Sequence, residues 1–347
     1  MPHQVRQRLE EKEERLSPWA ARSRLSLGRS RTEPPCPWRT AFQRDRDRIL
    51  YSNAFRRLKH KTQVFIAPLG DHYVTRLTHT LEVAQIDRTI ARALNLNEDL
   101  TEAIALGHDL GHTPFGHVGE EVLNELQGFS HSKQSLRVVD VLENEGQGLN
   151  LSHEVRMGIL SHSKPKEAML VQGSTEETVE SQIVRLADSV AYINHDTADA
   201  IRAGLITEKE LPSHTIAILG STPSQRINAI VADIVRSSWA ATAEVSVERP
   251  LIQMSTPMLA AAEELRQFLF DKVYDVCARS QEAIQAREIV RLLYRHFINH
   301  PQALPQELSQ RQEPLERVTM DYIAGMTDRF AMHLAREIPQ GIPLSSS

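Results

Sequence analysis

Residues 76–121 read RLTHTLEVAQIDRTIARALNLNEDLTEAIALGHDLGHTPFGHVGEE. The first part of this stretch repeats apolar residues every three or four positions, which predicts helices over residues 76–96 and 97–107. The second part, from His108 onward, is rich in histidine and carboxylate side chains. The stretch therefore predicts helices that lead directly into residues with acid–base and metal-ligating chemistry.

Helical spacing continues along most of the 347-residue chain, and few segments show the apolar–polar alternation that marks a strand. The sequence shows no strand, glycine-rich turn and helix in succession, so a Rossmann or P-loop nucleotide site is disfavoured. We therefore predict an all-α fold. The other predicted helices span residues 114–126, 134–143, 155–162, 178–203, 223–241, 257–277, 281–297 and 315–336. The first of these would begin at Pro114, with Thr113 as its N-cap.

The composition excludes several classes of protein. Apolar residues make up 41% and charged residues 24%, which is typical of neither a disordered chain nor a membrane protein. Two cysteines exclude a disulfide scaffold and a zinc site built from cysteines. The first residues are too polar for a secretory signal, so we expect a cytoplasmic protein that does not associate with membranes.

Charge is distributed unevenly along the chain. The net charge is −5, yet residues 1–62 contain 16 Lys and Arg against 7 Asp and Glu. A basic first segment on an acidic body suits an anionic ligand such as a nucleotide or nucleic acid, and a solvated basic tail is the alternative. We expect a basic, partly disordered segment over residues 1–37, one domain over residues 38–337 and a tail over residues 338–347.

The histidine-rich string has the spacing of a ligand set. His108 and His112 lie four residues apart on one predicted helix face, and His117 and Glu120 lie three apart on the next. Imidazole and carboxylate groups together suit divalent ions such as Mn²⁺, Fe²⁺, Co²⁺, Ni²⁺ or Zn²⁺, with Mg²⁺ also compatible. Burying so many polar groups without a ligand would be costly, so the string favours a metal site.

Two other helices carry candidate ligands. His79 lies near the start of an amphipathic helix, and Asp188 lies on an otherwise apolar helix face, where it must be paired or bind a metal. Together with His108 and Asp109, these side chains could bind one ion, with the ligands contributed by four turns of helix.

The ordered set His79, His108-Asp109 and Asp188 resembles that of the HD-domain metal-dependent phosphohydrolases. Four segments resemble more closely the bacterial deoxyguanosine triphosphate triphosphohydrolase (dGTPase) family and its dGTPase-like proteins, and the resemblance covers about residues 38–337. It implies an HD-domain helical bundle with a helical C-terminal extension. It also implies hydrolysis of a deoxynucleoside triphosphate to the deoxynucleoside and inorganic triphosphate. The four segments are residues 54–65, 108–121, 187–203 and 321–329.

The resemblance further assigns roles to individual residues. One divalent ion per subunit (Mn²⁺, Mg²⁺, Co²⁺ or Ni²⁺) would be bound by His79, His108, Asp109 and Asp188. The catalytic residues would be His117, Glu120 and His112. The substrate contacts would be Gln63, Arg76, His131, Tyr192 and Asp196, and we add Arg57 and Lys61 as cations that would spread over the triphosphate.

These residue types suit that reaction. A bound ion polarises a phosphate oxygen and lowers the pKa of a water molecule, and cationic side chains neutralise the charge of the triphosphate. His117, polarised by Glu120, would handle the proton, and the sequence leaves open whether it acts as the acid or the base.

Two other functions remain open at this point. Another HD-type phosphohydrolase, such as a deoxynucleoside monophosphate 5′-nucleotidase or a phosphodiesterase, would use a similar metal site. A non-catalytic, nucleotide-regulated protein that binds nucleic acid would keep the fold without turnover. The family resemblance also implies a homo-oligomer, a tetramer or a hexamer, with residues 315–336 as a candidate contact and single-stranded nucleic acid as a further candidate partner.

Overall fold

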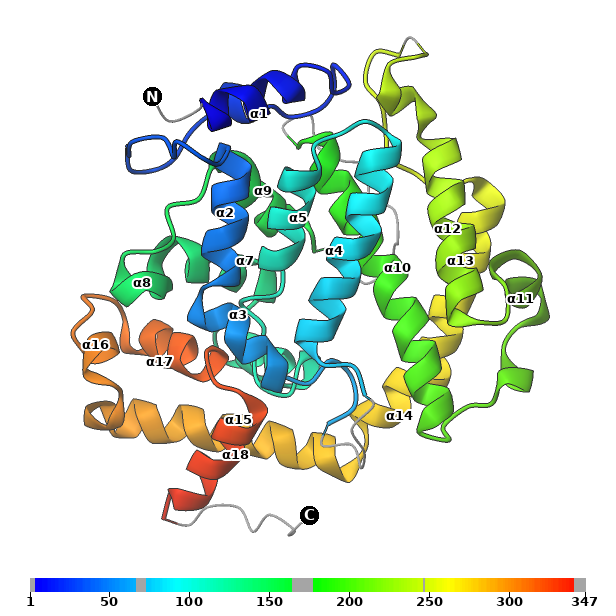
Figure 1. The fold of residues 1–347 in the computed structure, drawn as a ribbon. Coiled ribbons are helices and arrows are strands. Elements are labelled where there is room, and N and C mark those ends of the chain that lie inside the picture. Colours follow the sequence, from blue (N-terminus) through cyan, green and yellow to red (C-terminus); the bar gives the residue numbers. More distant parts are fainter. Residues whose placement is uncertain (1–3, 67–72, 164–176, 246, 340–347) are drawn as a thin grey trace.

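The computed structural model describes residues 4–66, 73–163, 177–245 and 247–339, and their regular elements are helices (Figure 1). Extended pairing among these residues is limited to two isolated bridges, Arg29 with Ser152 and Thr62 with Thr75. The prediction of an all-α fold is confirmed. No helix in these four ranges has both the length and the apolar character that a membrane span requires.

The α-helices are α1 Val5–Glu13, α2 Ala41–Leu50, α3 Asn53–Arg57, α4 Arg76–Ala93, α5 Glu98–Gly107, α6 His117–Gln127, α7 His131–Arg137, α8 Glu143–Gly146, α9 His153–Ser161, α10 Val179–Arg202, α11 Ser213–Leu219, α12 Pro223–Ser237, α13 Thr256–Leu269, α14 Asp275–Ala278, α15 Gln281–Asn299, α16 Gln306–Ser309, α17 Leu315–Ala324 and α18 Asp328–Glu337. The short 3₁₀ turns are η1 Ser23–Leu25, η2 Leu58–His60, η4 Glu208–Glu210, η5 Trp239–Thr242 and η7 Pro301–Ala303, and the π-helical turns are η3 Val138–Leu142 and η6 Phe270–Tyr274.

A central group of helices forms the larger hydrophobic core. Helices α4, α5 and α10 pack against one another, with α2 and α9 against α5 (Figure 1). Their apolar faces are fully buried, as at Ile90, Ile104 and Val184. Each such side chain stabilises the fold by about 1.5–3 kcal/mol relative to an exposed one. These helices therefore form a rigid base for any residue at their ends.

The C-terminal helices build a second, smaller core. Helices α15, α17 and α18 pack together, and α15 also packs on α6. Val122 and Leu123 of α6 belong to this second core and not to the central one. The histidine-rich stretch thus begins on the central helices and ends on a helix supported by the C-terminal part of the chain.

The start of α6 differs from the prediction. Phe115 and Gly116 have φ values of 61° and 58°, so the chain turns sharply before the helix begins at His117. The hydroxyl of Thr113 donates to the carbonyl of Gly116 at 2.8 Å and does not cap a helix. The prediction that a helix starts at Pro114 is therefore wrong, because the turn overrides the proline signal.

The predicted helix over residues 315–336 is interrupted. Helix α17 ends at Ala324 and α18 begins at Asp328, with Thr327 capping the backbone N–H of Phe330. The carboxylate of Asp328 accepts from the backbone N–H of Thr62 at 2.9 Å and of Phe115 at 2.8 Å. The interruption therefore lets the C-terminal part hold two loops beside the histidine-rich stretch.

The N-terminal segment is more structured than the sequence indicated. Residues 4–37 contain α1 and η1, and the Ser17 hydroxyl donates to the carbonyl of Ala241. The buried Glu13 carboxylate accepts from the backbone N–H of Ser23 at 2.6 Å. Specific polar anchors of this kind leave no trace in composition, and partial disorder within residues 1–37 stays an expectation. Residues 340–347 of the expected tail lie outside the described residues.

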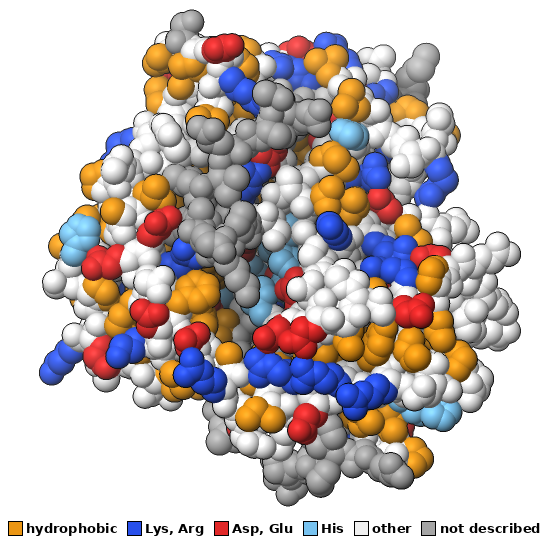
Figure 2. Space-filling view, turned by 180° about the vertical axis from the view of Figure 1, so that it is seen from behind, with side chains coloured by type: hydrophobic (Ala, Val, Ile, Leu, Met, Phe, Trp, Pro, Cys, Tyr) orange, Lys and Arg blue, Asp and Glu red, His pale blue; other side chains and the backbone are white. Residues whose placement is uncertain are grey.

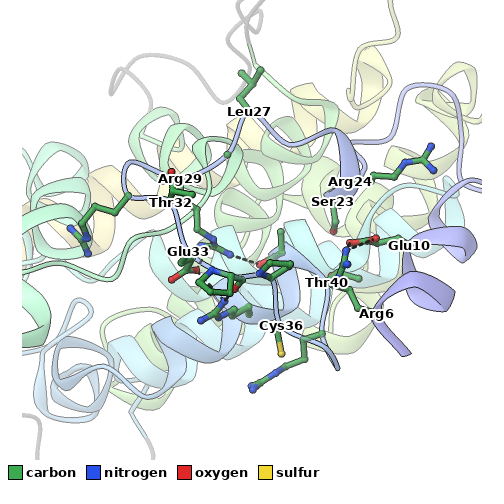
Figure 3. Close-up of a pocket in the computed structure, with 17 residues that line it drawn as sticks. Arg6, Glu10, Ser23, Arg24, Leu27, Arg29, Thr32, Glu33, Cys36 and Thr40 are labelled. Carbon is green, nitrogen blue, oxygen red and sulfur yellow. Dashed lines mark hydrogen bonds and ion pairs between the residues drawn. The ribbon is translucent and has the colours of Figure 1, made fainter. Parts of the chain in front are cut away.

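Residues 6–36 and the start of α2 enclose a cavity of about 520 Å³ (Figure 3). Six arginines line it, and most of them are paired with carboxylates. The basic surplus of this segment is therefore largely neutralised within the fold. The pairs are Arg6 with Glu10, Arg24 with Glu14, Arg29 with Asp45 and Glu33, Arg39 with Asp47, and Arg44 with Glu33.

Candidate metal centre and active site

Two helices and the loop that follows a third bring the four predicted metal ligands together. His79 lies in the first turn of α4, His108 and Asp109 follow the end of α5, and Asp188 lies in the middle of α10. His79, His108 and Asp109 are at most 3% exposed, whereas the Asp188 side chain is 24% exposed. The site is thus buried on three sides and open at Asp188.

The distances between the ligand atoms fit a single cation. His79 Nε2 lies 3.1 Å from Asp188 Oδ1 and 3.9 Å from Asp109 Oδ2. His108 Nε2 lies 3.4 Å from Asp109 Oδ1 and 4.0 Å from Asp188 Oδ1. An ion about 2.0–2.2 Å from each atom would hold neighbouring ligand atoms about 3–4 Å apart.

The imidazole of His108 is already oriented for a cation. Its Nδ1 lies 2.6 Å from the carbonyl oxygen of Ala105, which can only accept, so Nδ1 carries the proton. The lone pair is then on Nε2, which is buried and has no hydrogen-bond partner. A buried acceptor without a partner is costly, and a cation at this position would remove that cost. The residues present therefore fit a divalent metal ion.

The protonation states favour the same conclusion. Burial would raise the pKa of Asp109, but His108, His112 and Arg76 together hold it well below its ordinary value. Burial also opposes ionisation of Asp188, yet the hydrogen bond from His79 and the neighbouring His108 lower its pKa. Burial lowers the pKa of His79. Ionised carboxylates and a neutral imidazole are the forms that bind metal.

Glu120 connects two further histidines. His117 Nδ1 lies 3.1 Å from Glu120 Oε2, and His131 Nδ1 lies 2.8 Å from Glu120 Oε1. The backbone N–H of His131 also donates to Glu120 Oε1 at 2.8 Å. Burial would raise the pKa of Glu120, but the hydrogen bonds from His117 and His131 lower it strongly. One carboxylate therefore orients two imidazoles.

His112 links this pair to the metal ligands. Its ring stacks on that of His131 with the centroids 4.0 Å apart, and its Nε2 lies 3.2 Å from Asp109 Oδ1. Burial and the nearby Arg76 guanidinium lower its pKa well below the ordinary value. His112 is therefore a neutral, buried bridge, whereas the His117 side chain is 70% exposed. Figure 2 shows histidine side chains at the bottom of a hollow near the centre of the face drawn there.

A glycine allows the close approach that this arrangement needs. A Cβ atom at Gly111 would lie 2.2 Å from the backbone nitrogen of Ser135 and 2.6 Å from the carbonyl oxygen of His131. Neither backbone atom can move aside as a flexible side chain could. Only glycine therefore lets the loop after Asp109 lie directly against α7, which carries His131.

Arg76 is placed to meet an anion. The side chain is 1% exposed, and one guanidinium nitrogen donates to Asp109 Oδ2 at 2.7 Å. The other two nitrogens, Nε and Nη2, are buried and have no hydrogen-bond partner among the residues that the structure describes. A phosphate group could accept from them, so the geometry agrees with the role expected of Arg76.

The other expected substrate residues differ in their surroundings. Gln63 has a buried side-chain oxygen without a hydrogen-bond partner. Burial raises the pKa of Tyr192, whose hydroxyl lies beside Arg266. The Asp196 carboxylate already accepts from the Tyr274 hydroxyl at 2.6 Å. For Gln63, Tyr192 and Asp196, contact with a substrate stays a prediction.

Lys61 and Arg57, the two cations expected to meet the triphosphate, contact backbone carbonyls in this structure. The ammonium group of Lys61 is buried and donates to the backbone carbonyls of His112 and Ala324. Burial and the neighbouring Arg57 lower its pKa to about 7. Both side chains line a cavity of about 650 Å³ between α3 and α17, and Arg57 donates there to the carbonyl of Gly325 at 3.3 Å. Lys61 therefore fixes the histidine-rich loop, and contact of Lys61 or Arg57 with a triphosphate stays a prediction.

Sequence reasoning missed two histidines beside the metal ligands. His162 Nε2 lies 3.1 Å from His131 Nε2, and His195 Nε2 lies 3.0 Å from His79 Nδ1. His162 follows a short helix and has no motif around it. His195 could have been identified from the sequence, because it lies seven residues after Asp188 and therefore on the same face of the helix.

Comparison with known families and proteins agrees with this geometry. The HD domain family matches residues 76–193, and the phosphohydrolase-associated domain matches residues 252–337. A protein of Caldanaerobacter subterraneus named deoxyguanosinetriphosphate triphosphohydrolase-like protein is 53% identical, covering 96% of this chain and 95% of its own length. A protein with the same name from Desulfatibacillum aliphaticivorans is 51% identical, covering 94% of this chain and 96% of its own length. A solved phosphohydrolase structure from Bacteroides thetaiotaomicron is similar over 84% of this chain and 69% of its own, with 19% identity and a TM-score of 0.48.

Proposed function

This chain belongs to the HD-domain family of deoxyguanosinetriphosphate triphosphohydrolase-like proteins, and from that membership we propose that it hydrolyses deoxynucleoside triphosphates to the deoxynucleoside and inorganic triphosphate. The coarser statement, that it is an HD-domain phosphohydrolase, follows from the family alone. The proposal adds the substrate class, the bond that is cleaved and the cytoplasm as the place of action.

The observation that carries the proposal is the position of Arg76. Its two unpartnered guanidinium nitrogens are buried next to Asp109, which is itself a metal ligand candidate. A phosphate that accepted from Arg76 would therefore lie beside the ion. A divalent ion bound by His79, His108, Asp109 and Asp188 would supply a polarised phosphate oxygen and an activated water.

The residues around that centre can perform the proton transfer. Water attacks the α-phosphorus, the bond from phosphorus to O5′ breaks, and O5′ leaves with the electron pair and takes up a proton. Glu120 holds Nδ1 of His117, so Nε2 is the nitrogen that can exchange a proton with the reacting groups. The exposure of His117 agrees with a group that meets the substrate. The buried His112 and the half-buried His131 would orient the pair formed by His117 and Glu120.

The alternative phosphohydrolases would use the same centre, so the product decides between them. The protein is incubated with each of the four dNTPs, the four NTPs and the dNMPs, singly and in pairs, with Mn²⁺ and with Mg²⁺. Triphosphate released from a dNTP, with NTPs much slower, supports the proposal. Orthophosphate from a dNMP would favour a 5′-nucleotidase. No turnover with any nucleotide, alone or paired, would favour a non-catalytic protein.

A further inference from the structure

The two histidines of the metal centre have different partners for the nitrogen that faces away from the ion. His108 Nδ1 donates to the Ala105 carbonyl of its own helix. His79 Nδ1 instead lies 3.0 Å from Nε2 of another histidine, His195, which is 4% exposed. The two rings meet edge to face, with centroids 5.2 Å apart and an angle of 80°. His79 is therefore oriented by a side chain and not by the backbone.

The chemistry of this contact follows from the protons that are available. His79 Nε2 lies 3.1 Å from Asp188 Oδ1, on the side where a cation would bind. A cation bound there takes the lone pair of Nε2, so His79 then carries its proton on Nδ1. His195 Nε2 must then accept that proton, which requires His195 to carry its own proton on Nδ1. Only one arrangement of protons across the two rings is thus compatible with a bound cation.

The far side of His195 continues into a buried acidic group. His195 Nδ1 lies 2.8 Å from Asp196 Oδ1, although the two atoms are not aligned as a hydrogen bond. The other carboxylate oxygen, Asp196 Oδ2, accepts from the Tyr274 hydroxyl at 2.6 Å. Tyr274 lies in η6, within the residues matched by the phosphohydrolase-associated domain. The carboxylate that favours a proton on His195 Nδ1 is thereby held in place by the C-terminal half of the chain.

We propose that His195 is a positioning residue for the metal centre. It accepts from His79 Nδ1, fixes the tautomer and orientation of that ligand, and is itself oriented by the Asp196 carboxylate that Tyr274 holds. Outer partners of this kind typically contribute 10- to 100-fold to metal affinity. The inference rests on the metal centre of the proposed function and not on the identity of the substrate.

The test is the affinity for Mn²⁺ of chelator-treated, full-length protein, measured from free Mn²⁺ by electron paramagnetic resonance without nucleotide. We compare His195→Leu, which cannot accept, with His195→Gln, whose side-chain carbonyl can reach His79 and accept. We expect His195→Leu to weaken Mn²⁺ binding by about 10- to 100-fold and His195→Gln by less than about threefold. The matched control is Thr197→Val on the same helix, which removes a buried hydroxyl that donates to the Ile193 carbonyl.

Two results would overturn the proposal. One is unchanged Mn²⁺ affinity in His195→Leu. The other is an equal loss in His195→Leu and His195→Gln, because a purely structural role does not depend on the acceptor atom. If His195→Leu does not fold, His195→Asn replaces it, since its carbonyl is too short to reach His79. Failure of the wild-type protein to bind Mn²⁺ would instead contradict the metal centre itself.

Discussion

His108 shows how a single side chain can be prepared for a cation before one is bound. The Ala105 carbonyl fixes the proton on Nδ1, and burial leaves Nε2 without another partner. The neighbouring Asp109 stays ionised because the histidines and Arg76 around it hold its pKa well below the ordinary value, against the opposing effect of burial. The free-energy cost of burying these polar side chains is therefore offset only when a cation is bound by all four ligands.

We therefore expect His108→Ala to weaken Mn²⁺ binding by more than about 100-fold, which is more than the loss of an outer partner costs. Turnover should be lost at the same time, while the helical content measured by circular dichroism stays close to that of the wild type. Metal-dependent activity at the wild-type level in this variant, or full activity in a chelated sample, would rule out the metal centre.

The role of His117 can be separated from that of the ligands. It contacts Glu120 at 3.1 Å and none of the four ligand candidates in the contacts recorded for the described residues. His117→Ala should lower kcat by about 10²–10⁴-fold, as expected for a positioned acid or base, and should leave Mn²⁺ affinity unchanged. A parallel loss of Mn²⁺ affinity would instead make His117 a ligand.

At the scale of elements, the central helices were predictable and the turns between them were not. Helices α4, α5 and α10 follow the apolar spacing of their own sequences, so their existence and the face they bury could be read from the sequence. The turn at Phe115 and Gly116 could not, because its positive φ values depend on contacts with Thr62 and Asp328 far away in the chain. The four metal-ligand candidates that the family resemblance named lie side by side. Lys61 is held by backbone carbonyls that no local pattern reveals.

Glu180 shows how elements are joined by a buried charge. The side chain is fully buried in the first turn of α10, and Oε1 accepts from the backbone N–H of Ala21 and of Asn97. The other oxygen, Oε2, has no partner. Burial raises the pKa of Glu180 to about 7, even though these hydrogen bonds oppose the shift. The N-terminal segment, α5 and α10 therefore meet at one carboxyl group.

This shift predicts how stability depends on pH. Between the ordinary pKa of about 4.5 and the folded value, the unfolded chain is ionised while the folded one keeps its proton, so stability falls as pH rises toward about 7. Glu180→Gln should remove this pH dependence, which contributes at most about 3 kcal/mol to the free energy of unfolding. The stability of the variant minus that of the wild type should therefore be greater at pH 8 than at pH 4.5. Chemical denaturation at both pH values measures the difference. An identical pH profile in the two proteins would contradict it.

At the scale of the whole molecule, the metal centre depends on two cores. The ligands His79 and Asp188 lie on helices of the central core and His108 directly follows another, α5. Helix α6, which carries His117 and Glu120, instead packs on α15 of the C-terminal part. Asp328 and Tyr274 add direct hydrogen bonds from the C-terminal part to the loops and helices of the site. We infer that the phosphohydrolase-associated segment completes the active site.

The expected assembly is also a property of the whole molecule. Phe330 on α18 is 42% exposed, and the helix lies at the edge of the second core, where a second copy could cover it. We expect a tetramer or hexamer, with residues 315–336 in the contact. Sedimentation velocity at micromolar concentration checks this, and a monomer under those conditions would contradict it.

The most direct test of the proposed reaction is the position of solvent oxygen in its products. The Mn²⁺-loaded protein is incubated in ¹⁸O-labelled water with dGTP alone, and with dGTP mixed in turn with each of the other three dNTPs. The position of the label in the products is measured by phosphorus NMR and mass spectrometry. The account predicts inorganic triphosphate that carries one solvent oxygen on a terminal phosphate, together with unlabelled deoxyguanosine. Pyrophosphate or orthophosphate as the inorganic product, or label in the deoxynucleoside, would contradict it.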